Sequence, residues 1–400
     1  MADQTLAKYV NELSILTVLR TQGGQSRADI ARKLSLTPAT ITRLIANLEV
    51  RGLVREVRQQ RVSGAREVGR PGLNVEIDPE GAYFLGIEIG VGIIRFALLN
   101  LLALTVNSSE VFVSRSLEPA EAVKAIGDHI AMLSHDIRFR DRILGVGVTI
   151  PGLVTNSGYI INLPILGWKD VDLGALLKEV TSLPCSIENN ANAAAFGSVY
   201  TQPGLSSVSA VFLKLGTGVG GAAILNGRLL RGATGTAGEL GHIKLSENGP
   251  LCSCGQRGCL EARTNLRALA RGYLGTDELS EEKLFALPAE VAMKAADGDA
   301  KAIEAIKQLS HWLGIGLVSL VNVFNPGTVV LGGAMLPVAE ACLEEVRDKI
   351  RTSIIPGIAM PDVRLSPLGK YECAVGAAAI AHHNAFDISR VSLAEPEVHP

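Results

Sequence analysis

The sequence predicts an α/β protein in which a short helical head, residues 1–78, precedes a larger body. Two patterns support this prediction. Apolar residues between positions 10 and 48 recur every three or four residues, which is typical of amphipathic helices. From Tyr83 onward, buried strands and glycine turns alternate with amphipathic helices, which is typical of an α/β body. A chain of 400 residues is also too long for one ordinary core.

Charge divides the chain near the same place. Residues 1–75 contain twelve Lys or Arg and six Asp or Glu, a balance of +6, and because the whole chain sums to −2, the other 325 residues carry −8. A basic head indicates binding to a polyanion. No apolar run reaches the roughly 18 residues of a membrane span, and the N-terminus lacks a secretory pattern. We therefore expect a cytoplasmic protein with reduced thiols.

The head is expected to contain three helices and a basic wing. The apolar positions of the first helix are Val10, Leu13, Leu16 and Leu19. Ser26, followed by Asp29, predicts the start of the second helix. Thr37 and Pro38 predict the start of the third, and Gly52 its end. Two short helices joined by a tight turn, followed by an arginine-rich segment, predict a winged helix-turn-helix.

The exposed face of the third helix has the side chains of a DNA-reading surface. Short side chains let a helix enter the major groove, and arginine reaches guanine or phosphate. The residues on this face are Ala39, Thr40, Thr42, Arg43 and Asn47. Arg70, between a glycine and a proline, suits insertion into a narrow minor groove. The alternative is a three-helix module that contacts a protein instead of DNA.

A cluster of soft ligands stands out in the body. The stretch "GHIKLSENGPLCSCGQRGCLEA", residues 241–262, contains His242, Cys252, Cys254 and Cys259, whereas the whole chain has six cysteines. Three thiolates and one imidazole are the full tetrahedral set of a structural zinc ion, with no position left for a reactive water. The alternative is a group of small buried thiols in a core.

These residues, together with "TIPGLV", "ENNANAAAFG", "LGTGVGGAAILNG" and "NPGTVVLGG", resemble the ROK family of repressors, open reading frames and kinases. The resemblance runs from about residue 10 to residue 383 and is strongest to regulators such as xylose and N-acetylglucosamine repressors. It implies a two-lobed body like those of actin and hexokinase, with a ribonuclease H-like fold. The expected first lobe is 79–190 plus about 375–390, the second lobe with the zinc loop and dimerisation helices is 191–374, and 391–400 is a flexible tail.

The resemblance also implies a sugar site between the lobes, braced by the zinc loop. The residues at the family's sugar-binding positions are Asn189, Asn190, Glu239, His242 and Glu261. Carboxylates and amides suit this role because each can engage two neighbouring hydroxyls of a polyol. The alternative is that the glutamates are surface charges.

One departure from the family pattern bears on catalysis. The family's kinases have an aspartate at the position of Asn190, and an amide cannot accept the proton of a sugar hydroxyl. The first phosphate turn, which starts at Glu88, has Val91 where the family has glycine, although the second turn, Gly216–Gly221, is intact. We therefore expect no catalytic residues and no kinase activity.

The sequence thus favours a sugar-responsive transcriptional regulator of carbohydrate genes, most simply a repressor that a sugar releases from operator DNA. A helix-turn-helix protein gains affinity from two half-sites, so we expect a homodimer or a dimer of dimers. One alternative is a sugar kinase with an appended DNA-binding head, in which Glu188 replaces the missing base. Another is a DNA-binding protein whose body has lost its ligand.

Overall fold

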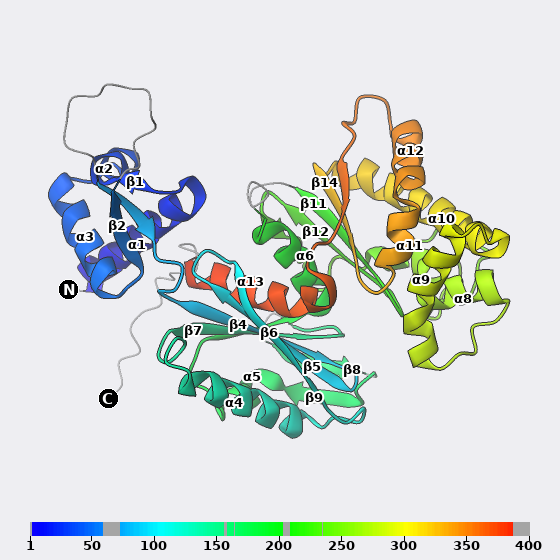
Figure 1. Cartoon of the computed structure of the whole chain (residues 1–400), viewed down its shortest axis with the longest axis horizontal. Coiled ribbons are helices and arrows are strands. Elements are labelled where there is room, and N and C mark those ends of the chain that lie inside the picture. Colours follow the sequence, from blue (N-terminus) through cyan, green and yellow to red (C-terminus); the bar gives the residue numbers. More distant parts are fainter. Residues whose placement is uncertain are drawn as a thin grey trace.

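The computed structural model describes residues 2–58, 73–155, 158–163, 165–202, 209–233 and 235–386. Figure 1 shows three parts: the head at one end, a first lobe below it, and a second lobe at the far end. The expected tail, 391–400, lies outside the described residues. No helix in the described part of the chain is long and apolar enough to cross a membrane.

The head has the predicted three helices, with a small sheet in the order β1-β3-β2. Its elements are α1 (Ala2–Gln22), β1 (Gln25–Ser26), α2 (Arg27–Leu34), α3 (Pro38–Val50), β2 (Val54–Arg58) and β3 (Leu73–Ile77). The predicted caps are confirmed, because Ser26 Oγ accepts from the amide of Asp29 and Thr37 Oγ1 from that of Thr40. Strands β2 and β3 are antiparallel and form the wing. The head is therefore the winged helix-turn-helix that the sequence predicts.

The first lobe is built on a five-stranded sheet in the order β10-β7-β4-β5-β6. Its strands are β4 (Tyr83–Gly90), β5 (Ile93–Asn100), β6 (Thr105–Phe112), β7 (Ile143–Ile150) and β10 (Cys185–Asn189). Beside them lie α4 (Pro119–His135), the hairpin of β8 (Tyr159–Leu163) and β9 (Trp168–Asp172), α5 (Leu173–Lys178) and α13 (Glu372–Phe386). Gly86 and Gly147 let α13 lie directly on the sheet, because a Cβ at either would be about 2 Å from a backbone oxygen of α13 (1.9 and 2.0 Å).

The second lobe repeats the same topology. Its strands are β11 (Ala210–Leu215), β12 (Val219–Leu225), β13 (Arg228–Leu229), β14 (Thr328–Gly332) and β15 (Asp362–Leu365). Each sheet has three consecutive antiparallel strands and two further strands parallel to the first of them. This repetition gives the two-lobed, ribonuclease H-like body that the resemblance implies.

Helices cover the outer side of the second sheet, where the largest apolar core lies. They are α7 (Leu260–Thr264), α8 (Leu266–Leu274), α9 (Glu281–Ala296), α10 (Ala300–Phe324), α11 (Leu336–Ala341) and α12 (Leu343–Ser353), with the short 3₁₀ helices η1 (Leu240–His242) and η2 (Gly369–Tyr371). Helix α6 (Asn190–Tyr200) packs on β11 and β12 and also on α13, so it lies between the two lobes. Helix α13, which packs on the first sheet, begins at Glu372, whereas the sequence predicts that the first lobe resumes at about residue 375. The domain bounds stay predictions.

Candidate functional site

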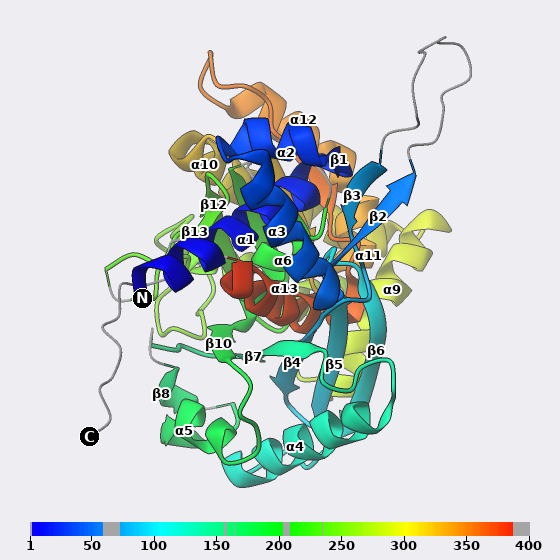
Figure 2. The same ribbon diagram turned by 90° about the vertical axis from the view of Figure 1, so that its left-hand side faces the viewer.

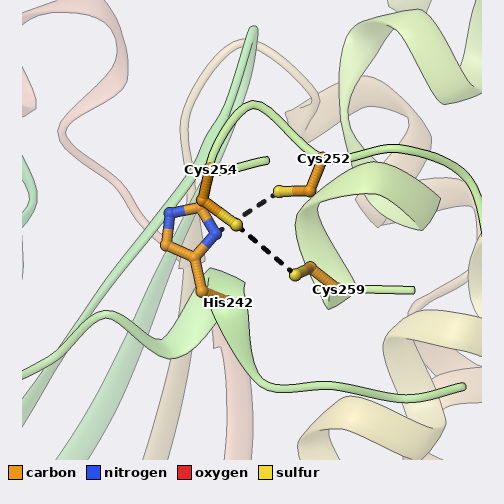
Figure 3. A group of neighbouring side chains, drawn as sticks. All are labelled: His242, Cys252, Cys254 and Cys259. Carbon is orange, nitrogen blue, oxygen red and sulfur yellow. Dashed lines mark hydrogen bonds between the residues drawn. The ribbon is translucent and has the colours of Figure 1, made fainter. Parts of the chain in front are cut away.

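The four predicted metal ligands lie together. Their ligand atoms in His242, Cys252, Cys254 and Cys259 are all within 4.8 Å of one another (Figure 3). Cys254 Sγ is 3.8 Å from Cys259 Sγ, and Cys252 Sγ is 3.4 Å from His242 Nδ1. A tetrahedral ion with metal–sulfur bonds of about 2.3 Å would hold its sulfurs about 3.8 Å apart. The cluster therefore has the number, chemistry and spacing of ligands for zinc.

Glycines make the compact loop possible. Gly255 and Gly258 have φ of +83° and +78°, a backbone region that side chains disfavour. A Cβ on Gly258 would also lie 1.8 Å from the carbonyl oxygen of Ser246. Cys259 is the N-cap residue of α7, so the loop passes directly into a helix. The cysteine loop is therefore anchored to the second lobe through α7.

The thiols differ in their electrostatics. Burial raises the pKa of Cys252 to about 12, whereas a backbone hydrogen bond from Gln256 lowers the pKa of Cys254. A metal ion binds thiolates, so its binding must displace the proton of Cys252. The affinity of the cluster for a metal ion is therefore expected to rise with pH.

Two of the predicted sugar-binding residues adjoin this cluster. Glu239 Oε2 is 3.7 Å from Nε2 of His242, the ring nitrogen that does not face Cys252. A carboxylate in that place orients a metal-bound imidazole. Glu261 is only 6% exposed, and its carboxylate accepts from the amide of Val219 and from the side chains of Cys252 and Ser253. Both glutamates therefore support the loop, and Glu261 is not the surface charge of the alternative interpretation.

Asn189 fixes the start of α6. Its Oδ1 accepts from the amides of Ala191 (2.7 Å) and Asn192 (3.3 Å). Its Nδ2 donates to the carbonyl oxygen of Gly152 at 2.9 Å. Both ends of the amide thus have partners within the chain, and a role in sugar binding stays a prediction.

Asn190 lies at the first helical position of α6 and is 9% exposed. Its Nδ2 donates to Glu88 Oε1 over 3.5 Å, while its Oδ1 is buried without a hydrogen-bond partner among the described residues. A carboxylate only accepts hydrogen bonds, so an amide suits the position beside Glu88 and a second carboxylate would not. The unpartnered oxygen is available to a hydroxyl of a ligand.

Lys214, which no sequence pattern singled out, joins the two lobes near the phosphate turns. This residue of β11 lies 3.9 Å from Glu88 Oε1 and 3.9 Å from Glu372 Oε1, and its Nζ donates to Cys373 Sγ over 2.8 Å. Burial lowers the pKa of Lys214, but Cys373, Glu88 and Glu372 raise it further, so the net direction is upward. The sequence signal that could have indicated Lys214 is a single lysine within the apolar strand "AVFLKL".

Two cavities in the described part of the chain lie apart from the predicted sugar site. A cavity of about 920 Å³ is lined by Glu188, Arg231, residues of β9, β10, α5 and α13, and the loops that join them. A second, of about 460 Å³, lies between head and body. None of the five predicted sugar-binding residues lines either one. Glu188 is ion-paired with Arg231 at 2.6 Å, and its Oε1 also accepts from the amide of Asn189 and from Asn192 Nδ2.

The predicted DNA-reading face is only partly exposed. Ala39, Thr42 and Arg43 are exposed on α3, as predicted. Thr40 and Asn47 are half-buried, so they contribute less to the exposed face, and the role of these residues in DNA binding stays a prediction. Thr40 Oγ1 is hydrogen-bonded to its neighbour Thr37, and Asn47 donates to Glu12 of α1. Arg70 lies outside the described residues, so its predicted contact stays untested.

A family model described as the ROK family matches residues 84–384, or 301 of the 400 residues. The chain belongs to the ROK family. A second model, described as the MarR family, matches residues 9–68 in the head. The family membership predicted from the motifs is therefore confirmed, and the head matches a known kind of DNA-binding domain.

Similar proteins include both regulators and kinases of the ROK family. The chain is 28% identical to a xylose repressor of Bacillus spizizenii over 397 residues, which is 98% of this chain and 100% of that repressor. It is 30% identical to a glucokinase of Halalkalibacterium halodurans over 307 residues, 74% of this chain and 93% of the kinase. The crystal structure of a ROK family transcriptional regulator, a homologue of the E. coli MLC protein, superposes with a TM-score of 0.78 at 25% identity, covering 96% of this chain and 98% of that one.

Proposed function

We propose that this chain is a sugar-responsive transcriptional repressor of carbohydrate genes. The winged head binds operator DNA, and a sugar bound between the lobes favours an arrangement that releases it. The full-length match to a xylose repressor carries this proposal, because it spans the head and the body together. The exposed Arg43 on α3 supplies a side chain suited to bases or phosphate.

The body is proposed to hold its sugar without phosphorylating it. Asn190, at the family's base position, cannot accept a proton, and its Nδ2 is directed to Glu88. Glu188, the alternative base, is already shared between Arg231, Asn192 and the backbone. Lys214 places a cation and its two carboxylate partners close to the first phosphate turn. These contacts support a receptor rather than an enzyme.

The metal is proposed to be a structural zinc ion. When bound, it would cross-link η1, the cysteine loop and the start of α7, the segments that carry Glu239 and Glu261. All four positions are filled by protein, which suits a brace. We further propose that the chain works as a homodimer or dimer of dimers in the cytoplasm, where it binds operator DNA.

A DNA-binding assay tests the proposal. Operator DNA is first selected from a random-sequence library with the full-length chain, and its affinity is measured at one fixed salt concentration with a panel of monosaccharides, because salt shifts such affinities strongly. At least one sugar should weaken operator binding. Asn190→Ala should bind the operator and respond less to that sugar, whereas Asn107→Ala, on the exposed edge strand β6, should respond normally. A panel in which no sugar changes the affinity contradicts the proposal.

A further inference from the structure

The head and the first lobe share one apolar core. Core residues of α1, α2 and α3 form a continuous cluster with Phe84, Leu101 and Ala381 of the body. Figures 1 and 2 both place α1 beside α13 at this junction. The cavity of about 460 Å³ lies at the same junction, between Leu13 of α1 and Phe386 of α13. The head is therefore docked on the body, with empty space beside the contact.

A polar contact completes this junction. The guanidinium carbon of Arg20, in the last turn of α1, lies 4.8 Å from the ring centre of Tyr200 in α6. The Tyr200 hydroxyl is hydrogen-bonded to His382 Nδ1 at 2.8 Å, and His382 Nε2 lies 3.0 Å from the carbonyl oxygen of Leu101. A carbonyl only accepts, so Nε2 carries the ring proton and Tyr200 donates to Nδ1. The three side chains, Arg20, Tyr200 and His382, form what we name the junction contact.

The junction contact is stable against changes in protonation. Burial raises the pKa of Tyr200 to about 12 and lowers that of His382 to about 3. Both groups are therefore neutral across the physiological range, and the cation of Arg20 is the one charge in the contact. A change of pH within this range therefore does not alter the junction contact, and we expect the contact to respond to changes in the packing around it.

Helix α6 connects the junction contact to the predicted sugar site. Asn190, whose buried Oδ1 has no hydrogen-bond partner in the described part of the chain, is the first residue of α6, and Tyr200 is the last. Ten residue steps of about 1.5 Å place them about 15 Å apart along one helix. Every residue of α6 is buried. A displacement at Asn190 must therefore move Tyr200 or deform a fully packed helix.

Helices α6 and α13 are too tightly packed to slide past one another freely. A Cβ on Gly197 would lie 2.7 Å from Gly376 Cα, and one on Gly376 would lie 1.9 Å from the carbonyl oxygen of Ala193. At its other end α13 contacts the second lobe, through Lys214 with Glu372 and Cys373. The two helices thus link the junction contact both to Asn190 and to the second sheet.

We propose that Arg20, Tyr200 and His382 are positioning residues that hold the head in its DNA-binding placement, and that α6 transmits the state of the cleft to them. The inference rests on the proposed function, because it names the route by which a sugar would act on the head. It requires that the two arrangements of the lobes place Tyr200 differently under Arg20.

Arg20→Ala tests the proposal in the full-length chain, with D-xylose and D-glucose as probes. In the unmodified chain, an effective sugar should reduce operator affinity at least about fivefold. Arg20→Ala should weaken operator binding in the absence of sugar and reduce the sugar response to below about twofold, while calorimetry still detects sugar binding, and Arg20→Lys should restore part of the response. Arg138→Ala is the matched control, because Arg138 stacks on Phe139 at the same 4.8 Å within the first lobe. A normal sugar response in Arg20→Ala overturns the proposal.

A second arm needs no sugar. Operator affinity is measured for Tyr200→Phe, which loses only the hydroxyl, for Asn190→Ala, and for the double variant. The two substitutions should deviate from additivity by at least about threefold, although their side chains do not touch. Additive effects overturn the coupling through α6. If no sugar of the panel affects the unmodified chain, that result counts against the proposed function, while the comparison of the single and double variants still decides the role of the junction contact.

Discussion

Asn190→Asp restores the residue that the family resemblance places at this position, and we expect it to destabilise the fold. The amide of Asn190 donates to Glu88 over 3.5 Å, so the new carboxylate would face a buried carboxylate at that distance. Two unit charges 3.5 Å apart repel by about 5 kcal/mol at an effective dielectric constant of 20. The new carboxyl group can avoid this repulsion by binding a proton, which costs about 4 kcal/mol at pH 7 and about 1.5 kcal/mol at pH 5 for a carboxyl of ordinary pKa 3.9.

Because the new carboxyl group binds a proton in the folded state, the stability of Asn190→Asp depends on pH. The folded variant holds its proton to a higher pH than the unfolded chain does, so its stability rises as the pH falls towards 4. Urea unfolding at pH 7 and pH 5 measures the effect, with Asn190→Ala as the control that loses the hydrogen bond without adding charge. We expect Asn190→Asp to be less stable than Asn190→Ala by several kcal/mol at pH 7, and the gap to shrink by about 2 to 3 kcal/mol at pH 5. Equal stability of the two variants at pH 7 would refute the Glu88–Asn190 contact.

Three further predictions follow from the structure. Cys259→Ser should remove the bound zinc, measured by elemental analysis, whereas Cys342→Ser, at a buried cysteine in the helical core of the second lobe, should retain about one ion per chain; full zinc content in Cys259→Ser would contradict the cluster. Arg43→Ala should weaken operator binding about tenfold and leave sugar affinity unchanged, and an unchanged operator affinity would remove α3 from the DNA interface. Burial lowers the pKa of His382 to about 3 in the folded chain, against 6.5 in the unfolded chain. The protein should therefore lose about 1.4 kcal/mol of stability per pH unit as the pH falls below 6.5. Thermal unfolding should show a smaller loss of stability with falling pH for His382→Phe than for the unmodified chain.

Local signals were sufficient to predict the head. Ser26 and Thr37 mark helix starts because their side-chain oxygens satisfy backbone amides that nothing else reaches, and this chemistry depends only on neighbouring residues. The metal cluster was also predictable, because three of its ligands lie within eight positions of the sequence. Half-burial of Asn47 was not predictable from helical spacing, since its partner Glu12 comes from another helix.

The sequence could not reveal the contacts that join distant parts of the body. Lys214 meets Glu88 and Glu372 only after two sheets and the last helix have come together. The same holds for Arg20 and Tyr200, which are 180 positions apart. A family resemblance indicates which residues surround the cleft, but it does not show that Asn189 and Glu261 already have partners within the chain. Such pairings depend on tertiary packing, which no local pattern encodes.

The most direct test of a receptor that binds sugar without modifying it is the mass of the sugar recovered after it has released the operator. The full-length chain, operator DNA, ATP and the effective sugar are incubated together, and the sugar is then analysed by mass spectrometry. We predict release of the DNA with the sugar recovered at its original mass. Recovery of a phosphorylated sugar at catalytic turnover would contradict the account.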